Sequence, residues 1–424
     1  MTHIYPFQAI HPPKERAQDI AAVPYDVVDA KEAAEIIKRQ PDSFLRISRS
    51  DSLLSGDPYC DLVYAVAKST FDQYLADGLL IKDNEPSLYI YSVTAEYPSA
   101  GKKSFTGLCG CFSLNEYKCG IIRKHELTRI EKEQDRTRHI DAVNANTGPV
   151  IFLHQKHNTL SALLSEEIKK AKTPSLSATA PDNSLHEIYQ ISDPDVIQSL
   201  ISSFADIAHL YIADGHHRCK SALNVLEQRE VTDPKQVHEE TKRVMGVAFA
   251  ESEVLVYGYH RLILAHNNDP DTFIQALKKI AKVTEYQLLS PSISQIPPHG
   301  DTKGFHIFHL YYKSAWYEVA IPKEQVQNPV DALDVTVLQN MVLEPLLHIT
   351  DPRTDPMLQY VGGSSPVSLL MQSVDKGEAT FAIAMQPVSV ADVRAIADAG
   401  EIMPPKSTWF EPKMLSGLTV HLLS

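Results

Sequence analysis

The residues best suited to chemistry stand together at positions 214–218, in the order Asp-Gly-His-His-Arg. A short apolar run, residues 209–213, precedes them, and apolar residues recur at helical spacing across residues 220–228. Because Asp-Gly is a turn dipeptide, the pattern predicts a buried strand, a sharp turn and a helix that begins at the two histidines.

Such a helix start suits an anion. The first turn of a helix carries backbone N–H groups without helical acceptors, together with the positive end of the helix dipole. Gly215 allows a phosphate to approach closely, Arg218 adds a fork of donors, and His216 and His217 can donate a hydrogen bond or move a proton. Ordinary turn chemistry and a solvated helix end explain the same residues, so both interpretations stay open.

A second reactive cluster is the segment Arg123-Lys124-His125-Glu126. A carboxylate beside Lys124 and His125 stays ionised at neutral pH, which makes Glu126 the first candidate for a general base. The alternative is a charge pair at the start of a helix.

Three loops add candidates for substrate binding. Tyr25 and Asp26 place a phenol and a carboxylate in a proline-stiffened loop before a predicted helix. Asn146 precedes a buried strand, where its amide can bind an amino-acid carboxylate or a ribose, or simply structure the loop. A Pro-Pro-Lys-Ser-Thr loop near the end supplies a point charge and two hydroxyls for a phosphate or a metal-bound water, from Lys406, Ser407 and Thr408.

The sequence patterns around these residues predict an α/β protein of the α+β kind. Residues 87–114 predict a β-hairpin, and residues 156–195 read as a polar insertion with one amphipathic helix. The charge run at residues 131–138 is typical of a solvated helix face, apart from Asp135 and Arg138. We expect a first domain over residues 1–265 that holds the Asp-Gly-His-His-Arg segment, and a separate α+β domain over residues 266–424.

Composition excludes several classes of protein. The 424 residues carry a formal net charge of -13, which argues against a general nucleic-acid binder. No signal peptide and no apolar run of membrane-spanning length is visible, so we expect a cytoplasmic protein without membrane partners. The five cysteines form no CxxC pair, and the motifs of P-loop, Rossmann, zincin and α/β-hydrolase proteins are absent.

The segment Ala-Asp-Gly-His-His-Arg-Cys-Lys-Ser-Ala, residues 213–222, resembles the signature of the ParB/sulfiredoxin-like superfamily. Within it, the sequence is similar to the free serine kinases and to domain-of-unknown-function family 1015. That last resemblance extends to Val-Pro-Tyr-Asp at residues 23–26, to residues 123–126 with Asp135-Arg136 and Asn146, and to Met-Pro-Pro-Lys-Ser-Thr-Trp-Phe at residues 403–410. The resemblance implies a ParB/sulfiredoxin-like core followed by a second α+β domain.

The same resemblance implies phosphoryl transfer between a nucleotide, ATP or ADP, and L-serine or O-phospho-L-serine, with Mg²⁺. Glu126 would then take the serine hydroxyl proton, and Asp214 would orient a histidine or hold Mg²⁺. The transferred phosphoryl group would be held by Gly215, His216, His217 and Arg218, with Lys406, Ser407 and Thr408 closing on the phosphates. The amino acid would be bound by Tyr25, Asp26, His125 and Asn146. A phosphoserine phosphatase using the same groups and a DNA-binding regulator of ParB type are the alternatives.

Overall fold

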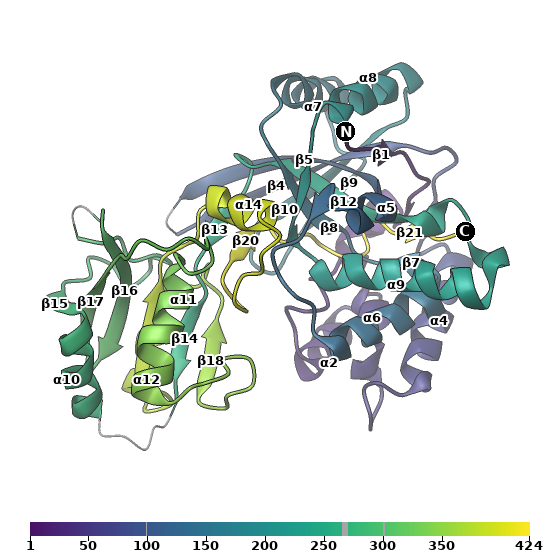
Figure 1. Cartoon of the computed structure of the whole chain (residues 1–424). Coiled ribbons are helices and arrows are strands. Elements are labelled where there is room, and N and C mark those ends of the chain that lie inside the picture. Colours follow the sequence, from purple (N-terminus) through teal and green to yellow (C-terminus); the bar gives the residue numbers. More distant parts are fainter. Residues whose placement is uncertain (99, 265–269, 300–301) are drawn as a thin grey trace. The chain divides into compact units, whose positions relative to one another are not determined.

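The computed structural model describes residues 1–98, 100–264, 270–299 and 302–424. The chain divides into two compact units (Figure 1). The first unit comprises Met1–Ala95, Lys102–Val254 and Pro412–Ser424, and the second comprises Glu96–Gly101 and Leu255–Glu411. The chain therefore leaves the first unit near Val254 and returns to it for its last residues. The domain boundary that the sequence predicted between residues 265 and 266 lies outside the described residues.

The first unit is built on a mixed sheet with strand order β6-β11-β8-β12-β5-β4-β10-β9, and β1 pairs with β5. The strands are β1 Ile4–Tyr5, β4 Leu88–Tyr97, β5 Gly101–Ser113, β6 Ile122–Arg123, β8 Val150–His154, β9 Leu176–Thr179, β10 Leu185–Ile191, β11 Leu210–Asp214 and β12 Arg243–Ala250. The strand β8 is buried at every position and β12 at all but its first, because helices cover both faces of the sheet there.

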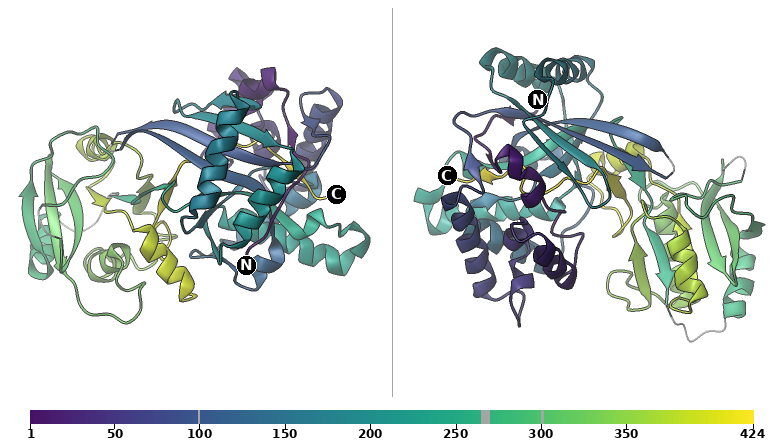
Figure 2. Two further views of the ribbon diagram at one scale, coloured as in Figure 1. Left: turned by 90° about the horizontal axis from the view of Figure 1, so that it is seen from above. Right: turned by 180° about the vertical axis from the view of Figure 1, so that it is seen from behind.

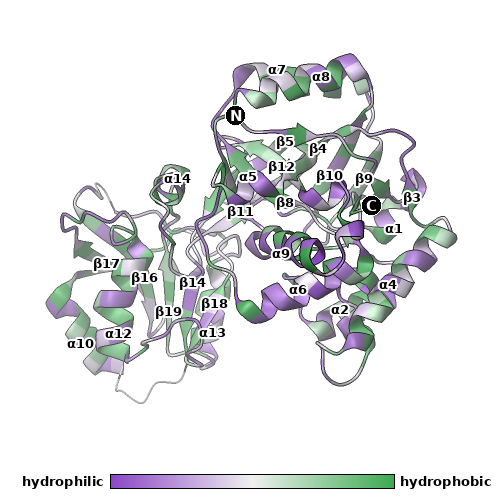
Figure 3. Cartoon of the chain, turned by 45° about the vertical axis from the view of Figure 1, so that its right-hand side comes forward, coloured by the Kyte–Doolittle hydropathy of each residue, from purple (hydrophilic) through white to green (hydrophobic). Residues whose placement is uncertain are grey.

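Helices α7 (Asn158–Ala171) and α8 (Pro194–Ala205) lie on one face of this sheet, and α6 (Ile130–Val143) and α9 (His216–Thr232) lie on the other (Figures 1 and 2). One hydrophobic cluster joins both layers to the strands; it includes Leu160 and Phe204 from the first pair of helices and Val225 from α9. The α6 helix is almost entirely hydrophilic (Figure 3), yet several of its polar side chains are buried. Buried polar groups need partners, so α6 is a place to look for a site.

A second cluster of the first unit packs α2 (Ala30–Arg39) and α4 (Asp61–Ala76) together. A capping box starts α2, in which Asp29 accepts from the Glu32 N–H at 2.8 Å and Glu32 accepts from the Asp29 N–H at 2.9 Å. The short elements around this cluster are α1 Ala17–Ile20, α3 Leu45–Ser48, β2 Ile10–His11, β3 Ile81–Lys82, β7 Ala145–Asn146 and β21 His421–Leu422. The short helix α5 Leu114–Lys118 packs in the first cluster instead. Because β21 pairs with β7, the end of the chain is tied to the strand that carries Asn146.

The second unit has a sheet with strand order β15-β17-β16-β19-β14-β18 and a two-stranded pair of β13 with β20. Its strands are β13 Leu255–Tyr257, β14 His260–Ile263, β15 Lys282–Tyr286, β16 Phe305–Tyr312, β17 Ala315–Pro322, β18 Leu358–Val361, β19 Phe381–Met385 and β20 Trp409–Glu411. Its helices are α10 Pro270–Ile280, α11 Asp334–Leu338, α12 Glu344–Leu347, α13 Ser368–Asp375 and α14 Val390–Asp398. In the described ranges of both units, no helix has the length and apolar character needed to cross a membrane.

The α/β class, of the α+β kind, is confirmed, as are the hairpin of β4 and β5 and the strand, turn and helix at residues 210–232. The prediction for residues 156–195 was incomplete. Beyond the expected helix α7, this stretch supplies β9 and β10, which extend the sheet beside β4. The Ser and Thr residues of β9 hid this edge strand, because a short strand with one solvated face carries little apolar signal, whereas β10 pairs on both sides.

Candidate functional site

The helix start at residues 214–218 has a backbone geometry that requires glycine. Gly215 lies in the left-handed region with φ 92°, and α9 begins directly after it without a side-chain cap. A Cβ at this position would lie 3.1 Å from Arg218 Nε and 3.3 Å from the Cα of Val150. Glycine avoids both the strain and the contact, and as the N-cap residue it offers no side-chain acceptor to the first-turn N–H groups of α9.

Asp214 is the centre of a charge cluster at this turn. The register of β11 against β8 shifts between Ile212 and Asp214, and such a bulge re-aims the side chain at the end of a strand. One Asp214 oxygen accepts from Lys413 Nζ at 3.1 Å and the other accepts from Arg218 Nη2 at 2.6 Å. Burial opposes ionisation, but the charges of Lys413 and Arg218 outweigh it and hold the pKa of Asp214 well below its usual range.

These two ion pairs oppose the metal role that the sequence predicted for Asp214. A bound Mg²⁺ would have to displace an ammonium or a guanidinium group from the carboxylate, and Mg²⁺ requires oxygen ligands in strict octahedral geometry. The geometry instead favours Asp214 as the group that holds Arg218 in place.

Arg218 is buried and only partly satisfied. Its Nη1 donates to the carbonyl oxygen of Pro149 and its Nη2 to Asp214. Its Nε is buried and has no hydrogen-bond partner in the part of the chain that the structure describes. A buried donor without an acceptor costs about 1–3 kcal/mol, so this atom marks a place for a bound acceptor.

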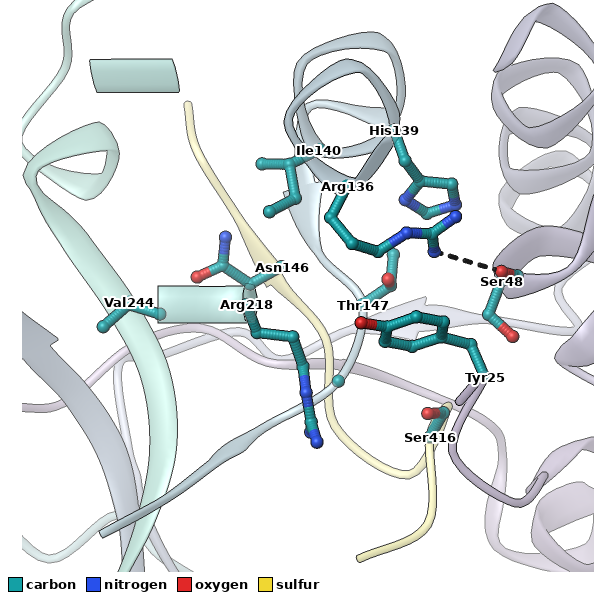
Figure 4. A pocket seen from close by; sticks show the side chains of 11 residues that line it. Tyr25, Ser48, Arg136, His139, Ile140, Asn146, Thr147, Arg218, Val244 and Ser416 are labelled. Carbon is teal, nitrogen blue, oxygen red and sulfur yellow. Dashed lines mark hydrogen bonds between the residues drawn. The ribbon is translucent and has the colours of Figure 1, made fainter. Parts of the chain in front are cut away.

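Arg218 lines a small pocket in the first unit, which we call the two-arginine pocket (Figure 4). The other residues that line it are Tyr25, Ser48, Arg136, His139, Ile140, Asn146, Thr147, Gly148, Val244 and Ser416. The volume open to the centre of a water molecule is about 20 Å³, room for on the order of one or two waters. The pocket therefore suits a small polar head group and excludes a nucleoside.

Arg136 is the second arginine of the pocket. It comes from α6, it is buried, and its guanidinium carbon lies 4.4 Å from the centre of the Tyr25 ring. It donates from Nε to Asp135 at 2.9 Å and from Nη1 to the Ser48 carbonyl oxygen at 3.2 Å. The prediction of a solvated face for residues 131–138 is thus wrong at Arg136, because Asp135 and Tyr25 provide partners that make its burial tolerable.

The loop predicted to bind substrate places Tyr25 at the pocket and leaves Asp26 exposed. Burial, together with the charge of Asp26, raises the pKa of Tyr25, so its hydroxyl stays protonated and can donate a hydrogen bond at neutral pH.

Asn146 also lines the pocket, and its amide is held in one orientation. The backbone N–H of Met245 donates to Asn146 Oδ1 at 3.0 Å, which fixes the orientation of the amide. Asn146 is buried, and its Nδ2 has no hydrogen-bond partner among the residues described. Two residues of the pocket lining, Asn146 and Arg218, therefore each carry a buried donor without a partner among the described residues.

The predicted base Glu126 lies beside two buried histidines. Glu126 Oε2 is 3.8 Å from His216 Nδ1, and the rings of His125 and His216 meet edge to face at 4.6 Å between centroids. Burial lowers the pKa of His125 to about 4 and, with the charge of His125 adding to it, lowers the pKa of His216 well below its usual value. Both rings are neutral at pH 7, while the Glu126 side chain is 39% exposed and reachable by a substrate.

This trio also resembles a metal-ligand set, because one ligand atom from each of His125, Glu126 and His216 lies within 4.8 Å of the others. Two imidazoles and one carboxylate suit a first-row transition ion better than Mg²⁺, which prefers oxygen.

His217 faces a different partner from His216. The backbone N–H of Arg129 donates to His217 Nε2 at 3.0 Å, so the neutral ring carries its proton on Nδ1. Burial lowers the pKa of His217, opposed by the charge of Asp26. His217 therefore acts as a neutral hydrogen-bond donor at pH 7.

The predicted phosphate-binding loop belongs to the second unit, where it is held by its own neighbours. Lys406 adopts φ 57°, and its Nζ lies 4.9 Å from the centre of the Tyr259 ring. The Ser407 hydroxyl donates to the Pro404 carbonyl oxygen at 2.7 Å. Lys406, Ser407 and Thr408 remain predicted phosphate ligands.

Two residues of the site had no predicted role. Lys413 stands alone after Pro412 and becomes part of the site only because the last residues return to the first unit. Arg136 was hidden in a charge run, although its helical phase places it with the buried Ile140 and Val143 on one side of α6. That phase is the signal from which Arg136 could have been found.

The fold and the site together define a mixed α/β protein with a donor-rich, partly unsatisfied pocket beside a glycine-started helix. The chain belongs to the family described as "Protein of unknown function (DUF1015)", whose model matches residues 4–336. No curated protein matches the sequence.

Solved structures show distant similarity. A free serine kinase in complex with AMP is 14% identical at a TM-score of 0.37, covering 73% of this chain and 91% of the other. A conserved hypothetical protein from Pyrococcus furiosus is 16% identical at 0.37, covering 74% and 95%. A C-terminally truncated SbnI from Staphylococcus aureus is 11% identical at 0.36, covering 74% and 87%. The proposed function therefore depends on the residues of this chain.

Proposed function

We propose that this chain transfers a phosphoryl group between a nucleotide, ATP or ADP, and free L-serine, with O-phospho-L-serine as the other partner. The observation that carries the proposal is the uncapped start of α9 at Gly215, with the half-exposed carboxylate of Glu126 lying 3.8 Å from the first-turn residue His216. The likeness of residues 213–222 to the ParB/sulfiredoxin-like signature supports placing the core in that superfamily.

The first-turn N–H groups of α9 and the Nδ1–H of His217 are suited to hold the transferred phosphoryl group. These donors are neutral and oriented, so they favour the charge that spreads over the phosphoryl oxygens in the transition state. Arg218, fixed by Asp214, adds a positive charge beside them.

Glu126 is the proposed base in the kinase direction. It takes the proton of the serine hydroxyl as the serine oxygen forms a bond to phosphorus, and the bond from phosphorus to the leaving nucleotide oxygen breaks. The amino acid is read by Tyr25, Asp26, His125 and Asn146, of which Tyr25 and Asn146 line the two-arginine pocket. Lys406, Ser407 and Thr408 are proposed to contact the nucleotide phosphates.

The same groups suit water as the attacking nucleophile, which would make the protein a phosphoserine phosphatase. A DNA-binding regulator of ParB type is a further alternative, which the net charge of -13 disfavours. Tight, salt-sensitive gel-shift binding to duplex DNA by the purified protein would place this alternative first.

The test incubates the purified protein with Mg²⁺, L-serine and either ATP or ADP, and separately with O-phospho-L-serine alone, following phosphoserine and free phosphate. We expect phosphoserine to form from serine and a nucleotide. Phosphate release from phosphoserine alone would favour the phosphatase, and no turnover in any assay would remove both enzymes.

Two variants with matched controls assign the roles. Glu126→Gln should lower kcat by at least about 100-fold, the usual contribution of a general base, while Glu131→Gln on the exposed start of α6 should leave it unchanged. His217→Ala should lower kcat/KM for the nucleotide, and His238→Ala, at an exposed position, is its control. Full activity of both site variants would contradict the proposed mechanism.

A further inference from the structure

The two-arginine pocket has a chemistry of its own, which points to a planar monoanion. Its two buried donors without partners among the described residues, Arg218 Nε and Asn146 Nδ2, belong to side chains that are each fixed by other hydrogen bonds. Neither side chain can turn away to find an acceptor without giving up those bonds. The acceptor must therefore come to them, as a water or as a ligand.

The charge around the pocket favours an anion over a neutral ligand. Arg136, Arg218 and Lys413 bring three cationic groups to this region, and Asp135 and Asp214 are carboxylates that pair with them. Asp26 is exposed, so solvent weakens the field that its charge exerts on Arg218.

The size of the pocket indicates which kind of anion it can bind. Its volume of about 20 Å³ for water centres takes on the order of one or two waters, which matches the two oxygens of a carboxylate. A phosphoryl group has more oxygens, arranged as a tetrahedron, and fits the helix start at Gly215 better than this pocket. The Tyr25 hydroxyl, which stays protonated, and the Thr147 hydroxyl supply further donors at the rim.

We propose that the two-arginine pocket binds the carboxylate group of a small carboxylic acid. The identity of the acid rests on the proposed function: if the protein acts on serine, the acid is the amino acid and its α-carboxylate fills the pocket. Arg218 contributes both to the pocket and to the start of α9, so a bound carboxylate would place the rest of the amino acid toward the phosphoryl site.

The experiment measures equilibrium binding by calorimetry with two pairs of probes. O-Phospho-L-serine is compared with O-phosphoethanolamine, and L-serine with ethanolamine, since each pair differs only by the carboxylate. We expect the carboxylate to strengthen binding at least about tenfold. Equal binding within both pairs, or no binding of L-serine, O-phospho-L-serine and acetate alike, would overturn the proposal.

Two variants locate the effect in this pocket. In Gly148→Ala the new methyl carbon lies 3.3 Å from Ser416 Oγ and 3.8 Å from Arg218 Nη1, so it intrudes on the pocket without changing its charge. In Asn146→Asp the oxygen that accepts from Met245 is kept and the donor is replaced by a negative oxygen. Both variants should lose the tenfold preference, and Asn115→Asp, at an exposed position of α5, should keep it.

Thermal melting shows whether each variant is folded. If Gly148→Ala does not fold, Asn146→Asp alone tests the assignment to this pocket. A folded variant that keeps the full preference contradicts the assignment to this pocket. Because binding is measured without turnover, the carboxylate pocket and the phosphoryl transfer can be disproved independently of each other. A carboxylate preference without phosphoryl transfer retains the pocket and removes the enzyme, and turnover without the preference does the reverse.

Discussion

At the scale of the single residue, Gly215 is constrained both by its backbone angle and by a neighbouring side chain. Gly215→Ala must place a methyl group in the left-handed region and 3.1 Å from Arg218 Nε. The backbone cost alone is about 1–2 kcal/mol, and the contact adds to it because Arg218 is fixed by Asp214. We expect a free energy of unfolding lowered by more than that amount, measured by urea denaturation.

A variant at Gly120 distinguishes the backbone cost from the cost of the contact with Arg218. It also has positive φ, 80°, but nothing lies within 4 Å of a Cβ there. Gly120→Ala should show only the backbone cost. Equal losses for the two variants would mean that Arg218 moves aside freely and is not held as we describe.

Asp214 and Lys413 allow a second test at this scale. In a double-mutant cycle of Asp214→Asn and Lys413→Met, we expect a coupling free energy of about 1–3 kcal/mol at pH 7. The folded-state pKa of Asp214 is lowered, so its contribution is full above its unfolded value and is lost as the pH falls through the folded pKa. The coupling should therefore shrink below about pH 4, the unfolded pKa of Asp; additive losses at pH 7 would contradict the pair.

At the scale of the element, α9 is anchored to α6 at the end far from the site. Arg229, buried on α9, donates to Asp141 Oδ1 at 2.8 Å and to Asn144 Oδ1 at 2.9 Å. Arg229→Met should lower the free energy of unfolding by about 1–3 kcal/mol, because it removes the charge-assisted hydrogen bonds that the buried guanidinium makes to Asp141 and Asn144. Lys170→Met, which removes an exposed pair with Glu166, should change it by less than about 1 kcal/mol. Similar small effects in chemical denaturation would show that the anchor is dispensable.

At the scale of the whole molecule, buried neutral histidines make stability depend on pH. Burial lowers the pKa of four histidines of the first unit to about 4: His125, His139, His154 and His186. Because the unfolded chain binds protons near pH 6.5, it holds more protons than the folded chain between pH 6.5 and 4. We expect the free energy of unfolding to fall steadily as the pH drops through this window.

Urea denaturation at half-unit pH steps measures this slope. His154→Gln should flatten it, since the buried His154 donates to the Gln155 carbonyl oxygen and glutamine keeps a donor without titrating. His238→Gln, at an exposed position, should leave it unchanged. A stability that is flat from pH 7 to pH 4.5 would contradict the neutral burial of these rings.

Elements with local causes could be predicted from the sequence. Asp29 and Glu32 form the capping box of α2, and Asp214-Gly215 ends β11 and begins α9. Caps, turns and hydrophobic periodicity act over a few residues, so their effect is readable from neighbours in the chain. The α+β class followed from the same short-range patterns.

Which charges are paired, and which donors lack a partner among the described residues, depends on contacts between distant segments. Lys413 meets Asp214 across 199 positions, Arg136 is buried against Tyr25, and Asn146 is oriented by Met245. The value of a charged or amide group depends on its burial and partners, and these depend on how distant segments pack. The sequence therefore predicted an anion site at the start of α9, while the pocket with its two unsatisfied donors emerged only from the fold.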